Sequence, residues 1–393
     1  MNICAIVCEY NPFHNGHRYL IEAARSALGE ESAVICAMSG DFVQRGEAAI
    51  YPKHDRARAA VAGGADLVLE LPLPWCMAPA ETFAGGAVGI LGATGIATHL
   101  CFGSEGGDLV SLQRAAELLL RPETDAQIRA ELETGVSYAA ARQRALEIMG
   151  GDPELLARPN DILAVEYLKA MRKQELPLTP FAVRRIGAGH DAPTEDDCPS
   201  ASFLRRKLRA GEKVSAWIPP ASAAALKRGA GPVDTAAVET ALLSRLRFIP
   251  EEAFAAAPDV SEGLEHRVFR AARTAPEIES AVEAASTKRY PKARVRRILV
   301  GAALGVKAAD SEGLPPYLRV LAANARGLAL LREMERRAAL PILTKPAHVR
   351  ELGARAERVF SLGAAAADLC ALGLSDRETR RGDRDWRSGP AIL

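Results

Sequence analysis

Short apolar runs that alternate with helical patterns constrain the fold of this chain more than any other feature. The first run, residues 3–8 (ICAIVC), ends in a polar loop, and a helical pattern follows over residues 17–28. Similar runs occur at residues 33–38, 66–71, 99–102 and 180–185, and further helical patterns at residues 53–62, 80–91 and 109–120. Strands that are apolar on both faces and alternate with helices predict a parallel sheet covered by helices on both sides.

Polar loops follow the predicted strands at residues 9–17, 39–47 and 103–108. In parallel sheets of this kind ligands bind beyond the carboxyl ends of the strands, so we expect these loops to border one site. The last predicted strand brings Arg184 and Arg185 to the same edge. Arg suits phosphate recognition, and a surface salt bridge is the alternative role for the two side chains.

The second half of the chain has a different pattern. Beyond the acidic, Pro-containing segment at residues 191–199, the sequence becomes helical and Ala-rich, with no clear strand period. A chain of 393 residues exceeds what one hydrophobic core usually organises. We therefore expect two domains, with a boundary near residues 210–233. The last stretch, residues 375–393, mixes charges with Gly and Pro, and we expect its end to be loosely held.

Cysteine usage and hydropathy indicate the cellular compartment of the protein. The seven Cys residues form no Cys-x-x-Cys pair and no Cys/His cluster, so no metal site is predicted. Cys4, Cys8, Cys36 and Cys101 lie in apolar runs, as buried thiols do in a reducing compartment. The N-terminus lacks the pattern of a signal peptide, and no run approaches the roughly 20 apolar residues of a membrane span. We therefore predict a cytoplasmic protein that does not enter a membrane.

The sharpest motif is EYNPFHNGH at residues 9–17, directly after the first predicted strand. Gly16 permits close approach of the backbone, and the N-terminus of the next helix offers free N–H groups to an anion. His14 and His17 are three residues apart, so both imidazoles can donate hydrogen bonds to phosphate oxygens and stabilise charge that grows during adenylyl transfer. The alternative is that His14 caps the helix and His17 is an ordinary surface or core side chain. The position after the first strand favours the phosphate site.

Other nucleotide motifs are absent from the sequence. It contains neither a Gly-x-x-x-x-Gly-Lys-Ser/Thr loop nor a strand followed by Gly-x-Gly-x-x-Gly, which argues against a P-loop NTPase and a dinucleotide oxidoreductase. Residues 39–46 (SGDFVQRG) join polar groups to two glycines, either as part of the pocket or as a plain turn. Gly103 would let an adenine or a ribose approach the backbone. Asn160 precedes a helix, where it serves as a ligand or as a cap.

A basic strip lies in the second half. No acid occurs between Ser286 and Leu299, and the strip consists of Lys288, Arg289, Lys292, Arg294, Arg296 and Arg297. Pro291 is well suited to begin a helix, on which Lys292 and Arg296 would share a face. Such a strip can bind a nucleic-acid backbone, and Tyr290 could stack on an exposed base. A solvated helix face is the alternative.

Together these segments resemble the tRNA(Met) cytidine acetate ligase family of the HxGH nucleotidyltransferase superfamily. The resemblance rests on EYNPFHNGH (9–17), MSGDFVQRGE (38–47), FGSE (102–105), RPNDILAVEYL (158–168), VRRIGAGHD (183–191), SASFLR (200–205), STKRYPKARVRRIL (286–299), YLRVLAAN (317–324) and LPILTK (340–345). It implies an α/β fold with an N-terminal Rossmann-like parallel sheet. The implied catalytic, ATP-binding domain covers residues 1–210, and a mainly α-helical, tRNA-binding domain covers residues 211–393.

The resemblance also implies an activity. Acetate would be activated by ATP to acetyl-adenylate with release of pyrophosphate, and the acetyl group would pass to N4 of the wobble cytidine of elongator tRNA(Met). We expect Mg²⁺ to accompany the ATP, and no obligate protein partner is evident. One alternative is a nucleotidyltransferase for a small phosphorylated metabolite, which has no use for a basic helix. Another is a nucleotide-sensing RNA-binding protein, which would release no pyrophosphate.

Site residues are implied by the matching motifs. The implied catalytic residues are His14, Gly16, His17 and Arg185. ATP binding is implied for Val7, Cys8, Glu9, Tyr10, Asn11, Pro12, Phe13, His14, Asn15, Gly16, His17, Arg18, Tyr19, Leu20, Gly103, Asn160, Arg184 and Arg185. The basic strip would contact tRNA through Lys288, Arg289, Lys292, Arg294, Arg296 and Arg297. No metal-ligating side chain is implied.

Overall fold

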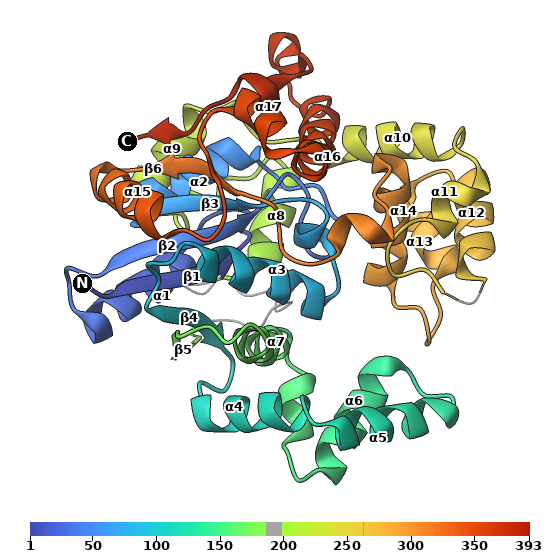
Figure 1. The fold of residues 1–393 in the computed structure, drawn as a ribbon. Coiled ribbons are helices and arrows are strands. Elements are labelled where there is room, and N and C mark those ends of the chain that lie inside the picture. The colour runs from blue at the N-terminus through green and yellow to red at the C-terminus, as the bar shows by residue number, and fades with distance from the viewer. Residues whose placement is uncertain (186–198, 262) are drawn as a thin grey trace.

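The computed structural model describes residues 1–185, 199–261 and 263–393. Its sheet has the strand order β5-β4-β1-β2-β3-β6-β7, and β8 pairs with β6 (Figure 1). The strands are β1 Ile3–Cys8, β2 Ala33–Ser39, β3 Leu67–Leu71, β4 His99–Ser104, β5 Thr179–Arg184, β6 Leu318–Ala323, β7 Ile342–Leu343 and β8 Ala391–Ile392. The first five strands pair in parallel, so the predicted parallel sheet is confirmed.

Helices follow most strands. Those of the first half are α1 Asn15–Leu28, α2 Lys53–Ala62, α3 Ala80–Ala93, α4 Leu109–Leu118, α5 Pro122–Glu133, α6 Tyr138–Ile148 and α7 Pro159–Lys173. Those of the second half are α8 Ala201–Arg209, α9 Pro220–Lys227, α10 Thr235–Leu246, α11 Glu251–Ala255, α12 Leu264–Thr274, α13 Ile278–Ala285, α14 Lys292–Leu304, α15 Ala325–Arg337, α16 Ala354–Ala371 and α17 Arg384–Arg387. Short 3₁₀ helices are η1 Trp75–Met77, η2 Pro153–Leu156, η3 Ala308–Ser311, η4 Pro346–Leu352 and η5 Arg377–Arg380. The sequence patterns predicted α1, α2, α3 and α4 to within two residues at each end.

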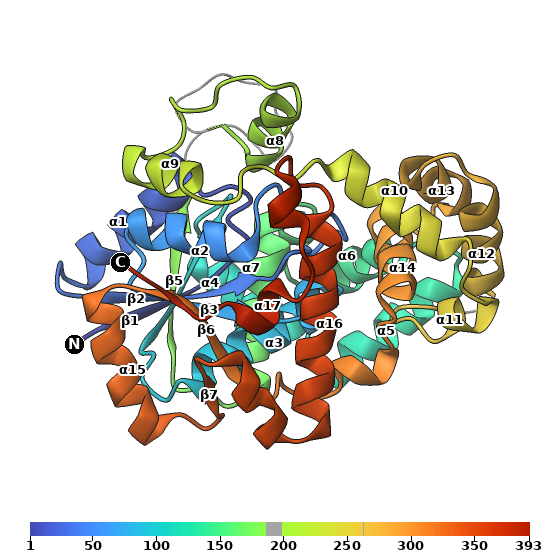
Figure 2. The ribbon, with the colours of Figure 1, turned by 90° about the horizontal axis from the view of Figure 1, so that it is seen from above.

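Side chains of the parallel strands alternate between two hydrophobic cores. Ala5 and Ile35 belong to the core that α3 and α7 cover, whereas Cys4 and Cys36 belong to the core beneath α1, α2 and α9. Figure 2 shows α1, α2 and α9 on one side of the sheet and α3 and α15 on the other. The strands are therefore buried on both faces, which explains their continuous apolar runs. The strand thiols are buried and free, as predicted.

The strand order places a ligand site before any side chain is considered. From β1 the chain adds β2 and β3 on one side of the sheet, and β4 and β5 on the other. In open α/β sheets ligands bind where the order reverses in this way, beyond the carboxyl ends of the strands. Here the reversal lies between β1 and β4. The loop after β1, the end of β4 and the N-terminal ends of α1 and α7 meet at that point.

The second half differs from its prediction in one respect. It is mainly helical, but β6 joins the sheet antiparallel to β3 and is buried along its whole length. The mainly helical pattern is confirmed, but β6 was not among the predicted strands. The run LRVLAA of β6 is short and rich in residues that also suit a helix, so its pattern did not separate the two structures. Whether the chain divides functionally at residue 210 stays a prediction.

The C-terminal stretch is also better fixed than expected. β8 pairs with β6, and Asp385 in α17 is only 1% exposed. Lys53 Nζ lies 2.6 Å from Asp385 Oδ2 and 2.7 Å from Glu70 Oε1. Arg319 Nη1 lies 2.7 Å from Asp385 Oδ2 and 3.0 Å from Glu70 Oε2. These four side chains, here called the buried ion-pair network, join α2, β3, β6 and α17. The expectation that the end of the chain is loosely held is therefore wrong for Asp385 and for β8.

Two helical lobes project from the sheet. Helices α4, α5 and α6 lie below α7 in Figure 1, and helices α10 to α14 form a lobe on the right. Within the described part of the chain, no helix is both long and apolar enough to cross a membrane.

Candidate active site

A cavity of about 430 Å³ opens at the reversal point between β1 and β4. Its wall includes the ends of β1 and β4, the start of α1, the loop after β2, and residues of α7 and α8. A volume of this size is typical of small-molecule sites. A larger hollow of about 490 Å³, beside Arg25, Asp66 and Leu393, is wide open and lies at the opposite edge of the sheet, where β3 begins. The topology therefore favours the first cavity.

The HxGH turn forms a double hydrogen-bonded cap on α1. His14 is the N-cap residue, and its Nδ1 accepts the N–H of Gly16 at 3.0 Å. In return, Nδ1 of His17 accepts the N–H of His14 at 3.2 Å. Because each Nδ1 accepts, the proton of each neutral ring must be on Nε2. The cap therefore fixes both imidazoles as Nε2–H donors, with ring centroids 3.8 Å apart.

Both imidazoles are uncharged near neutral pH. Burial, aided by Arg185 and Arg205, lowers the pKa of His14 to about 3. Burial, aided by His14 and Arg185, also lowers the pKa of His17 well below its usual range. Both rings line the cavity. The two alternatives from the sequence are thus compatible, since His14 caps the helix and still presents a neutral donor.

Gly16 has a steric reason to be glycine. A Cβ atom at this position would lie 2.9 Å from Cε1 and 3.1 Å from Nδ1 of His14. Those contacts are too short, so any side chain would displace the ring that caps the helix. The small residue therefore holds the imidazole in position as well as leaving the backbone open to a ligand.

The predicted ATP-binding segment 7–20 divides into two groups. Ten of its residues line the cavity, namely Val7, Cys8, Glu9, Tyr10, Asn11, His14, Gly16, His17, Tyr19 and Leu20. Pro12, Phe13, Asn15 and Arg18 do not. Phe13 is fully buried beneath the turn, and Asn15 donates to the backbone oxygens of Ala216 and Trp217. Arg18 pairs with Glu22 at 2.6 Å on the outer face of α1.

The other predicted residues come together on the β4 side of the cavity. Gly103, Asn160, Arg184 and Arg185 all line it, and Arg185 Nη1 lies 3.4 Å from Asn160 Oδ1. Glu105 holds Asn160 by accepting its backbone N–H at 3.1 Å and its side-chain N–H at 2.6 Å. Burial opposes ionisation of Glu105, but the hydrogen bonds from Asn160 outweigh it and lower the pKa of the carboxyl. The clamp by Glu105 was not predicted.

A buried Arg organises the loops around the cavity. Arg56 in α2 is 0% exposed and donates to the backbone oxygens of Glu9, Ser39 and Gly40, and to Tyr51 O at 2.9 Å. It thereby ties the end of β1 to the end of β2. Nothing in the helical pattern of α2 distinguished this residue from a surface Arg.

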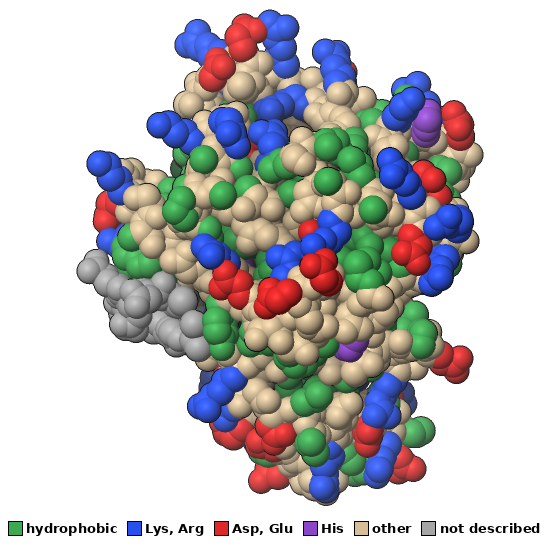
Figure 3. Space-filling model, turned by 90° about the vertical axis from the view of Figure 1, so that its left-hand side faces the viewer, with side chains coloured by type: hydrophobic (Ala, Val, Ile, Leu, Met, Phe, Trp, Pro, Cys, Tyr) green, Lys and Arg blue, Asp and Glu red, His purple; other side chains and the backbone are tan. Residues whose placement is uncertain are grey.

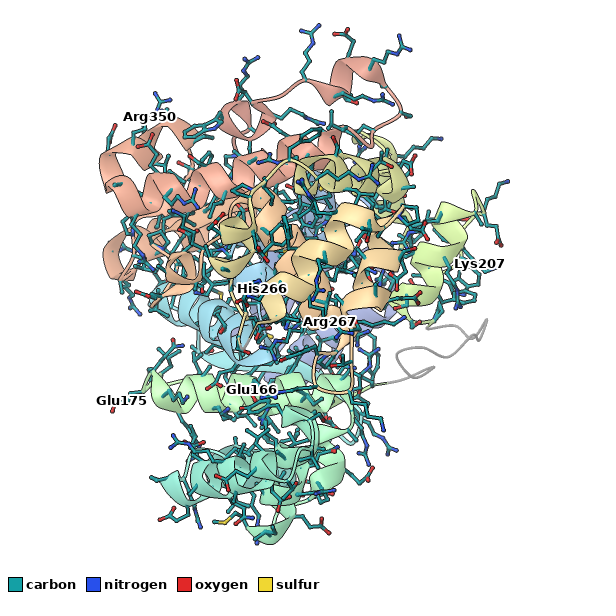
Figure 4. The ribbon with its side chains drawn as sticks, turned by 90° about the vertical axis from the view of Figure 1, so that its right-hand side faces the viewer. Glu166, Glu175, Lys207, His266, Arg267 and Arg350 are labelled. Carbon is teal, nitrogen blue, oxygen red and sulfur yellow. The ribbon has the colours of Figure 1, made fainter. Side chains whose placement is uncertain are left out.

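Further polar residues of the wall include Gln44, from the loop that the sequence offered as part of the pocket, and Glu47 and Arg205, which were not predicted. Gln44 donates its backbone N–H to Glu9 Oε1 at 3.0 Å, which orients that carboxylate. Arg205 comes from α8, at the right-hand edge of Figure 4 where Lys207 is labelled, and its Nη1 donates to Asn11 O at 3.1 Å. Only the SASFLR segment of the family resemblance pointed to this region.

The basic strip is less free than its sequence indicated. Acids from other elements pair with four of its members: Lys292 with Glu283 at 2.8 Å, Arg294 with Asp259 at 3.4 Å, Arg296 with Glu239 at 3.3 Å, and Arg297 with Asp259 at 2.8 Å. Arg296 and Arg297 are only 14% and 11% exposed. Lys288 is exposed, and the guanidinium of Arg289 lies over the ring of Tyr290. The acids therefore reduce the positive charge that the strip presents, most strongly at Arg296 and Arg297.

The strip adjoins the cavity. A Cβ atom at Gly46 would lie 3.1 Å from the backbone nitrogen of Arg297, so α14 packs directly on the loop after β2. That loop lines the cavity through Val43, Gln44 and Arg45. The opposite side of the molecule, drawn in Figure 3, intersperses Lys and Arg with acidic and apolar side chains.

Comparisons with known proteins agree with the motifs and the fold. The HIGH Nucleotidyl Transferase family model matches residues 1–385. The tRNA(Met) cytidine acetate ligase of Acetivibrio thermocellus is 35% identical over 100% of both chains, and that of Syntrophotalea carbinolica is 38% identical over 91% of this chain and 89% of its own. Thermotoga maritima TmcAL, 32% identical and covered completely, superposes with a TM-score of 0.93 in its apo form and 0.92 when bound with alpha-thio ATP. The chain therefore belongs to the HIGH nucleotidyl transferase family and, within it, to the tRNA(Met) cytidine acetate ligases.

Proposed function

We propose that this protein is an ATP-dependent ligase that acetylates N4 of the wobble cytidine of elongator tRNA(Met). Relatives that span its whole length carry the name tRNA(Met) cytidine acetate ligase, and a solved neighbour is bound with an ATP analogue. The observation that carries the proposal is the double cap of the HxGH turn. It holds two neutral Nε2–H donors at the cavity where the topology expects a ligand.

In the first step a carboxylate oxygen of acetate bonds to the α-phosphorus of ATP. The bond from that phosphorus to the bridging oxygen breaks, and pyrophosphate leaves with the electron pair. His14 and His17 would donate Nε2–H bonds to phosphate oxygens as negative charge grows on them. Arg184, Arg185 and Asn160 would bind the phosphates and the ribose from the β4 side. These roles need no proton transfer, which fits imidazoles that stay neutral.

Mg²⁺ would enter with the nucleotide rather than occupy a site of its own. In the described residues no group of three or more His, Cys, Asp or Glu side chains could hold a metal ion. Mg²⁺ is commonly held by phosphate oxygens and water, with one or two carboxylates. Glu9 and Glu47 are the carboxylates that line the cavity. When bound, the ion would neutralise phosphate charge.

In the second step N4 of cytosine attacks the acetyl carbonyl carbon. The bond to AMP breaks, AMP leaves with the electron pair, and the proton lost by the amine passes to the AMP phosphate or to water. The cytosine must be unpaired and splayed from the anticodon loop to reach a buried acyl-adenylate. We propose that the N-terminal end of the basic strip, with Lys288 and Lys292, holds the RNA backbone beside the loop after β2. Residues 1–210 would then supply the chemistry and the helices after them the RNA contacts.

The test is to incubate the protein with ATP, Mg²⁺ and labelled acetate, with and without bulk bacterial tRNA, and to measure label in the nucleosides. We expect labelled N4-acetylcytidine that is lost in His17→Ala and retained in Arg18→Ala, whose side chain lies outside the cavity. Acetate-dependent pyrophosphate release without label in RNA would refute the proposed acceptor. If neither pyrophosphate release nor label in RNA is observed, the ligase is refuted and a small-molecule nucleotidyltransferase is favoured. Because the reaction needs ATP and tRNA, we propose the cytoplasm as its compartment.

A further inference from the structure

The charges that line the cavity are unevenly distributed around the HxGH turn. Four guanidinium groups line it, those of Arg45, Arg184, Arg185 and Arg205. The two imidazoles add no charge. Arg184 and Arg185 reach the cavity from the end of β5, whereas Arg205 reaches it from α8. Positive charge thus flanks the two His side chains from two separate elements.

The guanidinium of Arg205 is held firmly but not saturated. It donates from Nη1 to Asn11 O and from Nη2 to Ser202 Oγ, each at 3.1 Å. Its Nε lies 3.8 Å from Glu47 Oε2, which is beyond hydrogen-bond distance. A guanidinium has five N–H donors, so donors remain after these two bonds. The side chain is only 14% exposed, and Arg205 is part of the cavity wall.

The proposed reaction has a use for a cation at this position. It brings a carboxylate against the α-phosphate, and two unit charges 4 Å apart repel by about 4 kcal/mol at an effective dielectric constant of 20. Neutral imidazoles can donate hydrogen bonds, but they cannot cancel that repulsion. Arg185 and Asn160 lie together on the β4 side of the cavity, where the proposed function places the nucleotide. Arg205 comes from a different element, α8, and is bonded to the turn itself through Asn11 O.

We infer that Arg205 is the acetate-binding residue, which pairs with the carboxylate of the small acid while it attacks the α-phosphorus. Arg forks match carboxylates in geometry, and the pair would weaken as the carboxylate becomes a neutral acyl group. The charge would then face the phosphate of the acyl-adenylate. This inference rests on the proposed function, because it assumes that a carboxylate is the substrate.

Arg209 provides a matched control on the same helix. It lies one turn after Arg205, and its Nη2 is also 3.8 Å from Glu47 Oε2, but it is 43% exposed and does not line the cavity. The experiment measures acetate-dependent exchange of pyrophosphate into ATP with purified Arg205→Ala, Arg205→Lys and Arg209→Ala. Losing a charge-assisted hydrogen bond should raise the KM for acetate by about 10- to 100-fold in Arg205→Ala, with the KM for ATP changing by less than about threefold. Arg209→Ala should match the wild type.

Two readouts separate binding from a structural role. Added guanidinium ion should lower the KM for acetate in Arg205→Ala, and Arg205→Lys, which keeps the charge, should lie between the wild type and Ala. If Arg205→Ala does not fold, Arg205→Lys provides the test: its KM for acetate should rise more than its KM for ATP. Equal rises in both KM values, or no response to guanidinium, would overturn the inference and leave Arg205 as a brace for Asn11. A wild-type protein without acetate-dependent exchange would overturn the proposed function, and this inference with it.

Discussion

Replacing His17 by Asn removes one hydrogen-bond donor from the cavity and leaves the cap of α1 in place. In the wild type, Nδ1 of His17 accepts the backbone N–H of His14 at 3.2 Å. In the variant, the side-chain oxygen of Asn takes the position of Nδ1 and accepts the same N–H. The group that is lost is Nε2–H. Removing one preorganised donor to a developing charge lowers kcat by about 10²- to 10³-fold. We expect the lower end here, about 10²-fold, because the donor is a neutral imidazole.

The assay is acetate-dependent exchange of pyrophosphate into ATP, together with the thermal unfolding midpoint. The KM for ATP should change little, because the donor acts mainly on charge that appears in the transition state. His17→Gln makes the converse change, since its amide nitrogen reaches toward the Nε2 position while the cap loses its acceptor. We expect Gln to keep more activity than Asn and to unfold at a lower temperature. If Asn keeps more than about a third of the wild-type kcat, the Nε2–H of His17 takes no part in catalysis.

The protonation states can be observed directly. Nitrogen spectra of protein labelled in its seven His residues should show His14 and His17 as Nε2–H tautomers. Because burial holds the pKa of His14 at about 3, its signals should not move between about pH 8 and pH 5. His17 should behave in the same way, as its pKa is also lowered. A midpoint near the ordinary value of about 6.5 for either ring would refute neutral donors and point to imidazolium.

Three further predictions test other parts of the structure. In Gly103→Ala the new methyl group would lie 3.3 Å from Cγ of Arg185 and would displace that side chain. The KM for ATP should therefore rise about tenfold, with an unchanged unfolding midpoint. An unchanged KM would show that Arg185 does not bind ATP. Lys53→Met breaks the buried ion-pair network and should lower the free energy of unfolding in urea by about 3–5 kcal/mol. Lys173→Met, at an exposed pair, should cost no more than about 1 kcal/mol, and equal losses would contradict the reasoning. Lys288→Glu should weaken tRNA binding and reduce the slope of log Kd against log salt by about one or more; an unaltered slope would exclude contact there.

Much of the first half could be predicted from the sequence because its signals are local. The burial of β1 on both faces gives a continuous apolar run, and the loop after it carries the HxGH turn. Residues at the ends of parallel strands meet at one edge, so Gly103, Arg184 and Arg185 were expected to lie together, and all three line the cavity. Asn160, at the start of α7, lines it with them. Local sequence also showed that His14 could cap α1. It could not show the tautomers, which depend on which nitrogen of each ring accepts an N–H.

What escaped prediction depends on contacts between distant segments. Arg205 returns to the turn from almost 200 residues away, on a helix whose own pattern is ordinary. The basic strip has no acid within it, yet folding brings Asp259, Glu239 and Glu283 against it. Charge counted along the sequence therefore overstated the charge that the strip offers to RNA. β6 was missed because a run of six buried residues rich in Leu and Ala fits a helix as well as a strand.

The start of α2 connects the C-terminal stretch of the chain to the loops that line the cavity. Lys53 sits in the buried ion-pair network through its side chain, and its backbone N–H donates to Asp41 Oδ1 at 2.8 Å. Arg56, one turn later, holds the carbonyl groups at the ends of β1 and β2. Burial opposes ionisation of Asp385, but Lys53 and Arg319 outweigh it and keep its pKa well below the usual range. The charge of Asp385 therefore persists at neutral pH and fixes the helix that holds the cavity loops, so β6 and α17 support these loops through α2.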